Sequence, residues 1–243
     1  MSDTRKVILV MADISGYTRF MMTNKLEVLH SQVIISELIK TIIDQVEIPI
    51  EVSKLEGDAI FLHAVKDDSD AAAWDNTRKA VGSKLLKFFD AFSNKISELS
   101  GTNMCVCKAC KNITQLKLKV IVHSGEALFY SINKFQELSG VDVIIVHRLL
   151  KNSVRSNEYI LMTEQAYKDI EFPEKVPVSE SKEEYDEIGK INTYVYQLPA
   201  SVGPLPYTGA QFSISSKIAH TIAKEYKTVL ILLGIKIGPK LNI

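Results

Sequence analysis

The sequence of 243 residues contains only three cysteines and one tryptophan, and it has no excess of charge of either sign. An odd number of cysteines crowded into CVCKAC argues against a disulfide framework and favours a reducing compartment or a metal. Basic and acidic residues balance at 29 each, so overall charge gives no reason to expect an anionic membrane or nucleic acid as the main partner. The best apolar run, VLILLGI, is far shorter than the roughly 20 residues that cross a bilayer.

Several signals of known chemistry are also missing. The stretch MSDTRKVILVMADISG has an apolar run that Asp13 interrupts and no cleavage site of small residues, so we expect a cytoplasmic protein. The sequence has none of the main motifs of P-loop NTPases, zincins or α/β-hydrolases. Basic residues interleaved with aromatic ones are not concentrated in any segment, so we expect no nucleic-acid partner.

The chain does contain alternating strand-like and helix-like patterns. They predict an α+β sandwich with a central, mainly antiparallel sheet and helices packed on one face of it. The predicted strands and hairpins cover 6–12, 50–65, 116–122 followed by a turn at Ser124 and Gly125 and a second strand, 159–162, and part of 183–198. The predicted helices cover 25–45, 69–99, 142–151 and 163–169.

We expect one domain over 1–199 with a cysteine-containing insert at about 100–115. Residues 200–211 hold two prolines and two glycines and are typical of a linker. The remaining segment, 212–243, is an apolar and basic extension. We favour an amphipathic helix that packs on the domain or on a second copy, with docking to a membrane surface as the less favoured alternative.

Two carboxylates stand where a buried strand meets a turn of small residues: Asp13 in ADISG and Asp58 in EGDAI. If the first strand lies beside the hairpin, both project at the same end of one sheet. Such a pair suits Mg²⁺ or Mn²⁺, which keep coordination positions for triphosphate oxygens. Gly16 and Gly57 let a phosphate approach the backbone closely. Taken singly, either aspartate also fits an ordinary turn residue.

The neighbours of these aspartates make the pattern more specific. VMADISGYTRF resembles the opening of the class III nucleotide cyclase catalytic domain, and KLEGDAIF resembles its second metal motif. VIVHSGEALFYS, GVDVIIVHRLL and EYILMTEQAYKDI are similar to later segments of that domain, in the right order. The resemblance covers about residues 5 to 198, points to a divergent bacterial-type branch, and implies a ferredoxin-like nucleotide cyclase fold.

The resemblance implies roles for individual residues. Asp13 and Asp58 would hold two divalent metals per site, Mg²⁺ or Mn²⁺, with the backbone carbonyl of Ile14 as a further ligand. Lys54 falls on the lysine that contacts the base in adenylyl cyclases, and Glu137 falls on the acidic residue that reads the base. The implied reaction converts a nucleoside triphosphate, with ATP favoured, into a 3′,5′-cyclic nucleotide and pyrophosphate.

Arg148 falls on the arginine that stabilises charge on the α-phosphate, and in this family it comes from the other subunit, so the resemblance implies a homodimer. The position of the ribose-binding asparagine is taken by Ile144, which cannot hydrogen-bond a sugar. Ile144 could instead be a core residue of a helix in another register, with Asn133 or Asn152 as the asparagine. A nucleotide-binding or sensing module without turnover, and a scaffold that docks through the extension, are the alternatives to an enzyme.

Cys105, Cys107 and Cys110 lie outside these motifs. Three thiolates could bind Zn²⁺ or part of an iron–sulfur cluster if a histidine, a water or a partner's cysteine completes the set; a redox thiol pair and plain loop cysteines are the alternatives. The histidines, at positions 30, 63, 123, 147 and 220, are scattered along the sequence. We expect His63, His123 and His147, which lie in apolar surroundings, to be hydrogen-bonded core or interface groups. The resemblance gives Glu56 no role, and we expect it to face solvent.

Overall fold

A computed structural model describes residues 3–66, 71–198 and 212–235, which divide into two compact units. The sheet unit comprises the described residues among 1–13, 45–88 and 118–198, and the helical unit comprises those among 14–44, 89–117 and 199–243. The predicted linker at 200–211 and the end of the extension at 236–243 lie outside the described residues.

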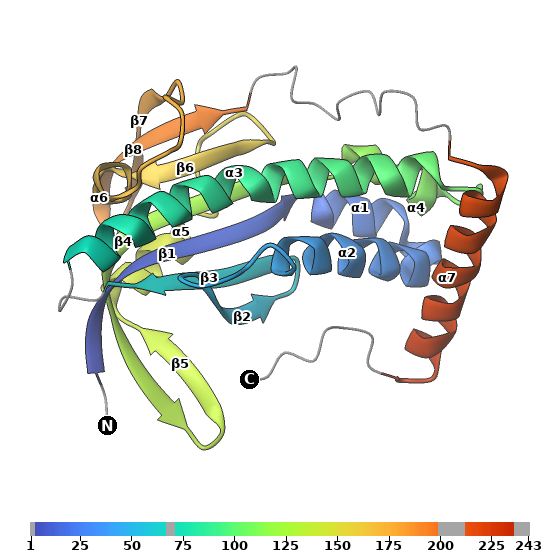
Figure 1. Ribbon diagram of the computed structural model, residues 1–243, viewed down its shortest axis with the longest axis horizontal. Coiled ribbons are helices and arrows are strands. Elements are labelled where there is room, and N and C mark those ends of the chain that lie inside the picture. Colours follow the sequence, from blue (N-terminus) through green and yellow to red (C-terminus); the bar gives the residue numbers. More distant parts are fainter. Residues whose placement is uncertain (1–2, 67–70, 199–211, 236–243) are drawn as a thin grey trace. The chain divides into compact units, whose positions relative to one another are not determined.

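The elements alternate along the chain much as their patterns predict (Figure 1). The strands are β1 (Asp3–Ser15), β2 (Glu51–Glu56), β3 (Ala59–Val65), β4 (Lys117–Ile132), β5 (Phe135–Ser139), β6 (Tyr159–Thr163), β7 (Ser179–Tyr185) and β8 (Gly189–Gln197). The helices are α1 (Tyr17–Thr23), α2 (Val28–Ile43), α3 (Ala71–Gly101), α4 (Lys108–Lys111), α5 (Val141–Arg148), α6 (Glu164–Asp169) and α7 (Ile214–Leu232).

One eight-stranded sheet organises the sheet unit. Its order is β2-β3-β1-β4-β6-β8-β7, with β5 pairing with β4 (Figure 1). The pairs β1/β3, β2/β3, β4/β5, β6/β8 and β7/β8 are antiparallel, and β4/β6 is parallel. The predicted class, α+β with a mainly antiparallel sheet and packed helices, is confirmed.

Helices were expected on one face of this sheet only, and that detail is wrong. Along β1, the alternate residues Val7, Leu9 and Met11 belong to the core cluster that also contains residues of α5. Ile8 and Val10, which point to the opposite face, are also fully buried. Burial of both sets means that both faces are covered, as continuous apolar strands favour.

The turn predicted at Ser124 and Gly125 is also wrong, because β4 runs unbroken through both residues. Gly125 is required by a close approach instead: a Cβ at this position would lie 2.2 Å from the Asp142 carboxyl carbon. Asp142 accepts a 2.7 Å bond from the Glu126 N–H and lies 2.9 Å from His123 Nε2. His123 bonds Thr163 through its other nitrogen at 2.9 Å, so the polar chain fastens the start of α5 to the sheet.

Gly125→Ala is therefore expected to destabilise the fold by about 2 kcal/mol or more, because the added methyl group displaces Asp142 and breaks its bonds. Urea unfolding measures the loss. Glu126→Ala is the matched control, since that exposed side chain is adjacent and its backbone bond survives. Equal stability of the Gly125→Ala variant and the wild type would show that the approach is not tight.

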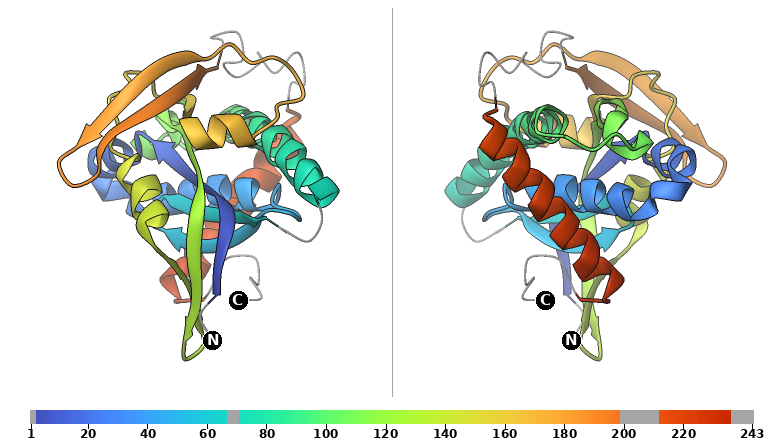
Figure 2. Two further views of the ribbon diagram at one scale, coloured as in Figure 1. Left: turned by 90° about the vertical axis from the view of Figure 1, so that its left-hand side faces the viewer. Right: turned by 90° about the vertical axis from the view of Figure 1, so that its right-hand side faces the viewer.

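The helical unit contains α1, α2, α4, α7 and the second half of α3. The predicted helix of the extension is present as α7, and Figure 2 shows it crossing α2. Lys227 of α7 pairs with Glu37 of α2, and Glu225 of α7 lies 3.4 Å from His30 of α2. Within the described residues, none of the helices has the length and apolar character needed to cross a membrane.

Candidate functional site

Asp13 and Asp58 meet at one end of the sheet, as their positions in the sequence suggest. Asp13 pairs in register with Ala59, the residue that follows Asp58, because β1 and β3 are antiparallel neighbours (Figure 1). Gly57, with φ +68°, makes the tight turn between β2 and β3 that places Asp58 there. The two carboxyl groups are close enough to interact by charge and by a side-chain hydrogen bond.

Lys119 of β4 is a member of this site that sequence reasoning missed. Its Nζ lies 2.9 Å from Asp13 Oδ2 and donates to the Leu150 carbonyl at 3.2 Å. Both side chains of the ion pair are largely buried, at 20% and 15% exposure. The signal was a lysine between the apolar residues Leu118 and Val120 of a predicted strand, because a cation in such a place requires a partner.

Burial and the neighbouring Asp13 charge raise the pKa of Asp58 to about 6, and Lys119 offsets only part of this. The folded state thus favours protonated Asp58, whereas the unfolded chain ionises near the usual value. Ionisation of Asp58 therefore lowers the free energy of unfolding. The loss develops as pH rises from about 4 to 6 and remains at higher pH.

Asp58→Asn should accordingly be more stable than the wild type at pH 7 and unfold at a higher temperature. The free energy of unfolding should rise by about 1 kcal/mol after allowance for solvent screening, with little difference at pH 4. Thermal unfolding at both pH values measures this. Asp75→Asn is the matched control and should change in the opposite direction, because a hydrogen bond from Lys79 lowers the pKa of Asp75. A less stable Asp58→Asn variant at pH 7 would contradict the account.

Lys54 and Glu137, the two residues expected to read a base, lie together. Lys54 Nζ is 3.5 Å from Glu137 Oε1, although they come from β2 and β5. An irregularity between Val52 and Lys54 interrupts the regular pairing of β2 with β3. Glu137 keeps its place by pairing with Tyr130 on β4. The pair is partly exposed and can contact a ligand.

Glu56 was expected to face solvent, and the structure corrects this. Its carboxylate lies 3.2 Å from His147 Nε2, and its side chain is only 33% exposed. His147 Nδ1 bonds the Val143 carbonyl at 2.7 Å, and the ring packs against Phe61 with centroids 5.0 Å apart. Glu56 therefore links the β2–β3 hairpin to α5. His63, His123 and His147 are hydrogen-bonded as expected. His63 and His123 are buried, whereas His147 is partly exposed.

Arg148, at the end of α5, forms a 2.9 Å ion pair with Glu187 rather than with the carboxylates. Ile144 lies one turn earlier and is 54% exposed, so it is not a core residue. Asn152 is engaged by the Leu149 carbonyl and the Tyr159 hydroxyl at 2.7 and 2.8 Å. Asn133 has φ 54° beside the β4–β5 turn. Neither asparagine shares the helix face of Ile144.

Ile14 and Gly16 follow Asp13 but belong to the helical unit. Ile14 is buried and is the second-last residue of β1. Gly16 precedes α1 with φ +87°, a left-handed conformation that glycine adopts without strain. A Cβ there would lie 3.3 Å from the Gln115 carbonyl oxygen.

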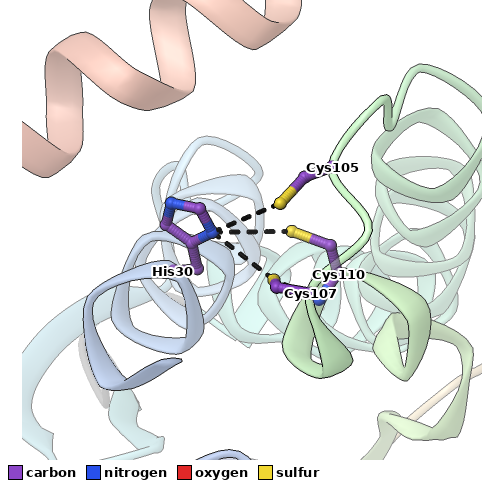
Figure 3. Close-up of side chains that lie close together, drawn as sticks. All are labelled: His30, Cys105, Cys107 and Cys110. Atoms are coloured by element: carbon purple, nitrogen blue, oxygen red, sulfur yellow. Dashed lines mark hydrogen bonds between the residues drawn. The ribbon is translucent and has the colours of Figure 1, made fainter. Parts of the chain in front are cut away.

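The three cysteines gather around His30 of α2 (Figure 3), which sequence reasoning left among the scattered histidines. His30 Nδ1 lies 3.5 Å from Cys107 Sγ, 3.7 Å from Cys105 Sγ and 4.0 Å from Cys110 Sγ. Burial raises the pKa of Cys110 to about 12 when no cation is bound, which disfavours its action as a redox thiol. The sequence pointed to His30 only indirectly, because three cysteines need a fourth ligand to complete a tetrahedral metal site.

Solved structures of nucleotide cyclases share this fold. The guanylyl cyclase Cya2 gives a TM-score of 0.56 at 12% identity, over 85% of this chain and 97% of that one. The adenylyl cyclase CyaB from P. aeruginosa gives 0.53 at 13%, over 80% and 95%. A bacterial light-regulated adenylyl cyclase gives 0.59 at 13%, over 93% of this chain but 58% of that one, so the chain spans little more than half of that protein. The fold is that of class III adenylyl and guanylyl cyclase catalytic domains.

A separate comparison by sequence places the chain in a family. The family model described as "Protein of unknown function (DUF2652)" matches residues 35–159, more than half of the chain, and the chain belongs to this family. The "Uncharacterized protein Rv2561/Rv2562" of Mycobacterium tuberculosis (strain ATCC 25618 / H37Rv) is 27% identical over 201 residues, covering 83% of this chain and 90% of that protein.

Proposed function

We propose that the chain is a divergent nucleotide cyclase, a phosphorus–oxygen lyase that converts a nucleoside triphosphate into a 3′,5′-cyclic nucleotide and pyrophosphate. The observation that carries the proposal is the carboxylate pair, Asp13 and Asp58, held at one end of the sheet in a cyclase fold. Two ionised carboxylates that lie close together repel each other, and the geometry of an ordinary turn does not require such a pair.

The donor set of this pair fits Mg²⁺ or Mn²⁺. Burial and the neighbouring Asp13 charge raise the pKa of Asp58, and a divalent cation held by both carboxylates would offset their mutual repulsion. Asp13, Asp58 and the Ile14 carbonyl would hold two metal ions, which would supply activation of the 3′-hydroxyl and neutralisation of the triphosphate. The Lys119 ammonium pairs with Asp13 and would keep its bond to the Leu150 carbonyl and turn toward a phosphate oxygen if a cation took its place at Asp13.

The Lys54–Glu137 pair supplies base selection. A primary ammonium and a carboxylate side by side offer a donor and an acceptor, which match the N1 acceptor and the amino donor on the Watson–Crick edge of adenine. Guanine also presents one acceptor and one donor, O6 and N1–H, so the positions of Lys54 and Glu137 around the base decide the choice. The match of Lys54 to the lysine that contacts the base in adenylyl cyclases favours ATP as the preferred triphosphate. The longer side chain of Glu137 relative to aspartate shifts its reach but keeps its function as an acceptor.

The arginine of a complete site would come from a second copy of the chain. Arg148 is about half exposed on α5, and its partner Glu187 is a solvent-facing residue, so the ion pair is readily exchanged for a phosphate. Arg148 then neutralises charge that develops on the α-phosphate, which is the role its planar guanidinium suits. This arrangement makes a two-fold homodimer the working state.

Ile144 favours a second candidate function, a module that binds nucleotide without turnover. Its exposed aliphatic side chain offers no hydrogen bond to a ribose, and one missing positioning contact costs on the order of a hundredfold in rate. The metal and base positions would remain usable for binding. We favour the enzyme because both carboxylates and Arg148 are retained, and we expect it to be slow.

The test is to incubate the purified full chain with ATP, GTP, CTP or UTP and Mn²⁺ and to identify products by mass spectrometry. The proposal predicts a cyclic nucleotide, with ATP turned over fastest. Triphosphate binding without product from any of the four would favour the binding module. Neither product nor Mn²⁺-dependent binding would overturn both.

A further inference from the structure

A second metal site lies outside the nucleotide site, in the helical unit. Ligand atoms of His30, Cys105, Cys107 and Cys110 all lie within 4.8 Å of one another (Figure 3). In a tetrahedral zinc site the nitrogen and sulfur ligands are about 3.6 Å apart, given bond lengths of about 2.1 and 2.3 Å. The distances of 3.5, 3.7 and 4.0 Å from His30 Nδ1 to the three sulfurs match this edge. We propose that these four side chains bind one Zn²⁺ ion.

The backbone around the cysteines supports thiolate ligands. Cys107 caps α4, and its sulfur accepts a 3.4 Å bond from the Cys110 N–H. Asn103 holds the backbone of Cys105 by two 2.9 Å bonds, one to the carbonyl and one from the N–H. A short loop thus fixes three sulfurs on one side of the ion, and α2 brings the imidazole to the other.

Helix α7 completes the site through outer contacts. The free nitrogen of His30, Nε2, lies 3.4 Å from Glu225, the carboxylate–histidine arrangement that orients metal-bound imidazoles. Lys224, only 9% exposed, donates from Nζ to Cys110 Sγ at 3.3 Å. Zinc with three thiolates carries a net negative charge, so the Lys224 ammonium neutralises it. A neutral thiol would leave this buried cation poorly compensated. Zinc occupancy is thereby coupled to the docking of α7.

The compactness of the cluster distinguishes one ion from an iron–sulfur cluster. In a two-iron cluster the protein ligands lie on different irons, so ligand pairs across the cluster are farther apart than the edge of one tetrahedron. Here every pair of ligand atoms lies within 4.8 Å. The set is also closed with four protein ligands, which is the pattern of a structural rather than a catalytic zinc site.

The first test measures metal content of the full chain after purification without chelators. We expect about one zinc per chain in the wild type and less than about a tenth of that in Cys107→Ser and His30→Ala. His220→Ala is the matched control, since His220 lies on α7 and pairs with Glu98 but is not one of the four ligands. Iron with inorganic sulfide, in place of zinc, would overturn the proposal in favour of a cluster.

The second test separates the outer contacts from general helix packing. Glu225→Gln should lower zinc affinity about 10- to 100-fold, measured by competition with a chromogenic chelator. Glu37→Gln removes the ion pair of Glu37 with Lys227, which also joins α2 to α7, and should leave zinc affinity unchanged. Equal losses in both variants would show that helix packing, not the orientation of His30, supports the site.

A measurement on the unmodified chain keeps the proposal falsifiable if variants fail to fold. The three thiols of the wild type are titrated with a disulfide reagent with and without a strong chelator. Zinc should slow the reaction of all three at least about tenfold, because bound thiolates are poor nucleophiles toward the reagent. Identical rates in zinc-supplemented and chelator-treated protein, together with absence of bound zinc, would overturn the site.

Discussion

Asp13→Asn is expected to lower the rate of cyclic nucleotide formation at least about a hundredfold, and Asp58→Asn should do the same. Each amide keeps the shape of the side chain but removes the charge that attracts a divalent cation. Because the two carboxylates bind the same two metal ions, the rate of the double variant should be little lower than that of either single variant. Initial rates with ATP and Mn²⁺ measure the effect.

Asp75→Asn is the control for this pair, because Asp75 is an exposed carboxylate of α3 that pairs with Lys79. Its rate should equal that of the wild type. Stability must be measured in parallel, since Asp58→Asn is expected to be more stable at pH 7 and a loss of rate cannot then be attributed to unfolding. Single variants that retain more than about half of the wild-type rate would exclude the carboxylate pair as the metal site.

Mixing two inactive variants is expected to restore activity. Arg148→Ala alone should lose at least about a hundredfold, because the guanidinium no longer stabilises the α-phosphate. If Arg148 and Asp13 reach one site from different protomers, a mixed dimer of Arg148→Ala and Asp13→Asn has one intact site of two. Random exchange gives half mixed dimers, so an equal mixture should reach about a quarter of the wild-type rate.

The control is an equal mixture of two separate proteins, the Asp13→Asn variant and the Asp58→Asn variant. Both substitutions fall on the same half of the site, so no mixed dimer has an intact site and no activity should return. An Arg148→Ala mixture that stays inactive although exchange is verified by size and label transfer would contradict the shared site. It would place all functional groups of one site within one chain.

The sequence was sufficient for most elements because their patterns are locally consistent. β1, β3 and α2 carry apolar periodicities that neighbouring turns delimit, and the pairing of β1 with β3 follows from both. The turn predicted at Gly125 failed because glycine serves equally for a turn and for a close side-chain approach, and only the position of Asp142 decides which. β7 was missed because its SESKEEY sequence is polar and its pairing depends on β8.

Some residues of the candidate sites could be predicted from the sequence and others could not. Asp13, Asp58, Lys54 and Glu137 could be proposed because each lies at a fixed spacing within a recognisable motif. Lys119 and the fourth cysteine-cluster ligand, His30, could not be, since they come from distant segments with no motif of their own. Pairings between segments far apart in the chain are a property of the tertiary structure, and a single sequence records them only as residues in need of a partner.

The most direct test of the central claim is the quantity of product per chain formed from ATP and Mn²⁺. Cyclic nucleotide and pyrophosphate are quantified together by mass spectrometry, for the wild type and for Asp13→Asn purified in parallel. The account predicts equal amounts of both products, rising in proportion to wild-type protein, and none above background from the variant. Equal product from both proteins, or no product from a wild type that binds the triphosphate with Mn²⁺, would contradict it.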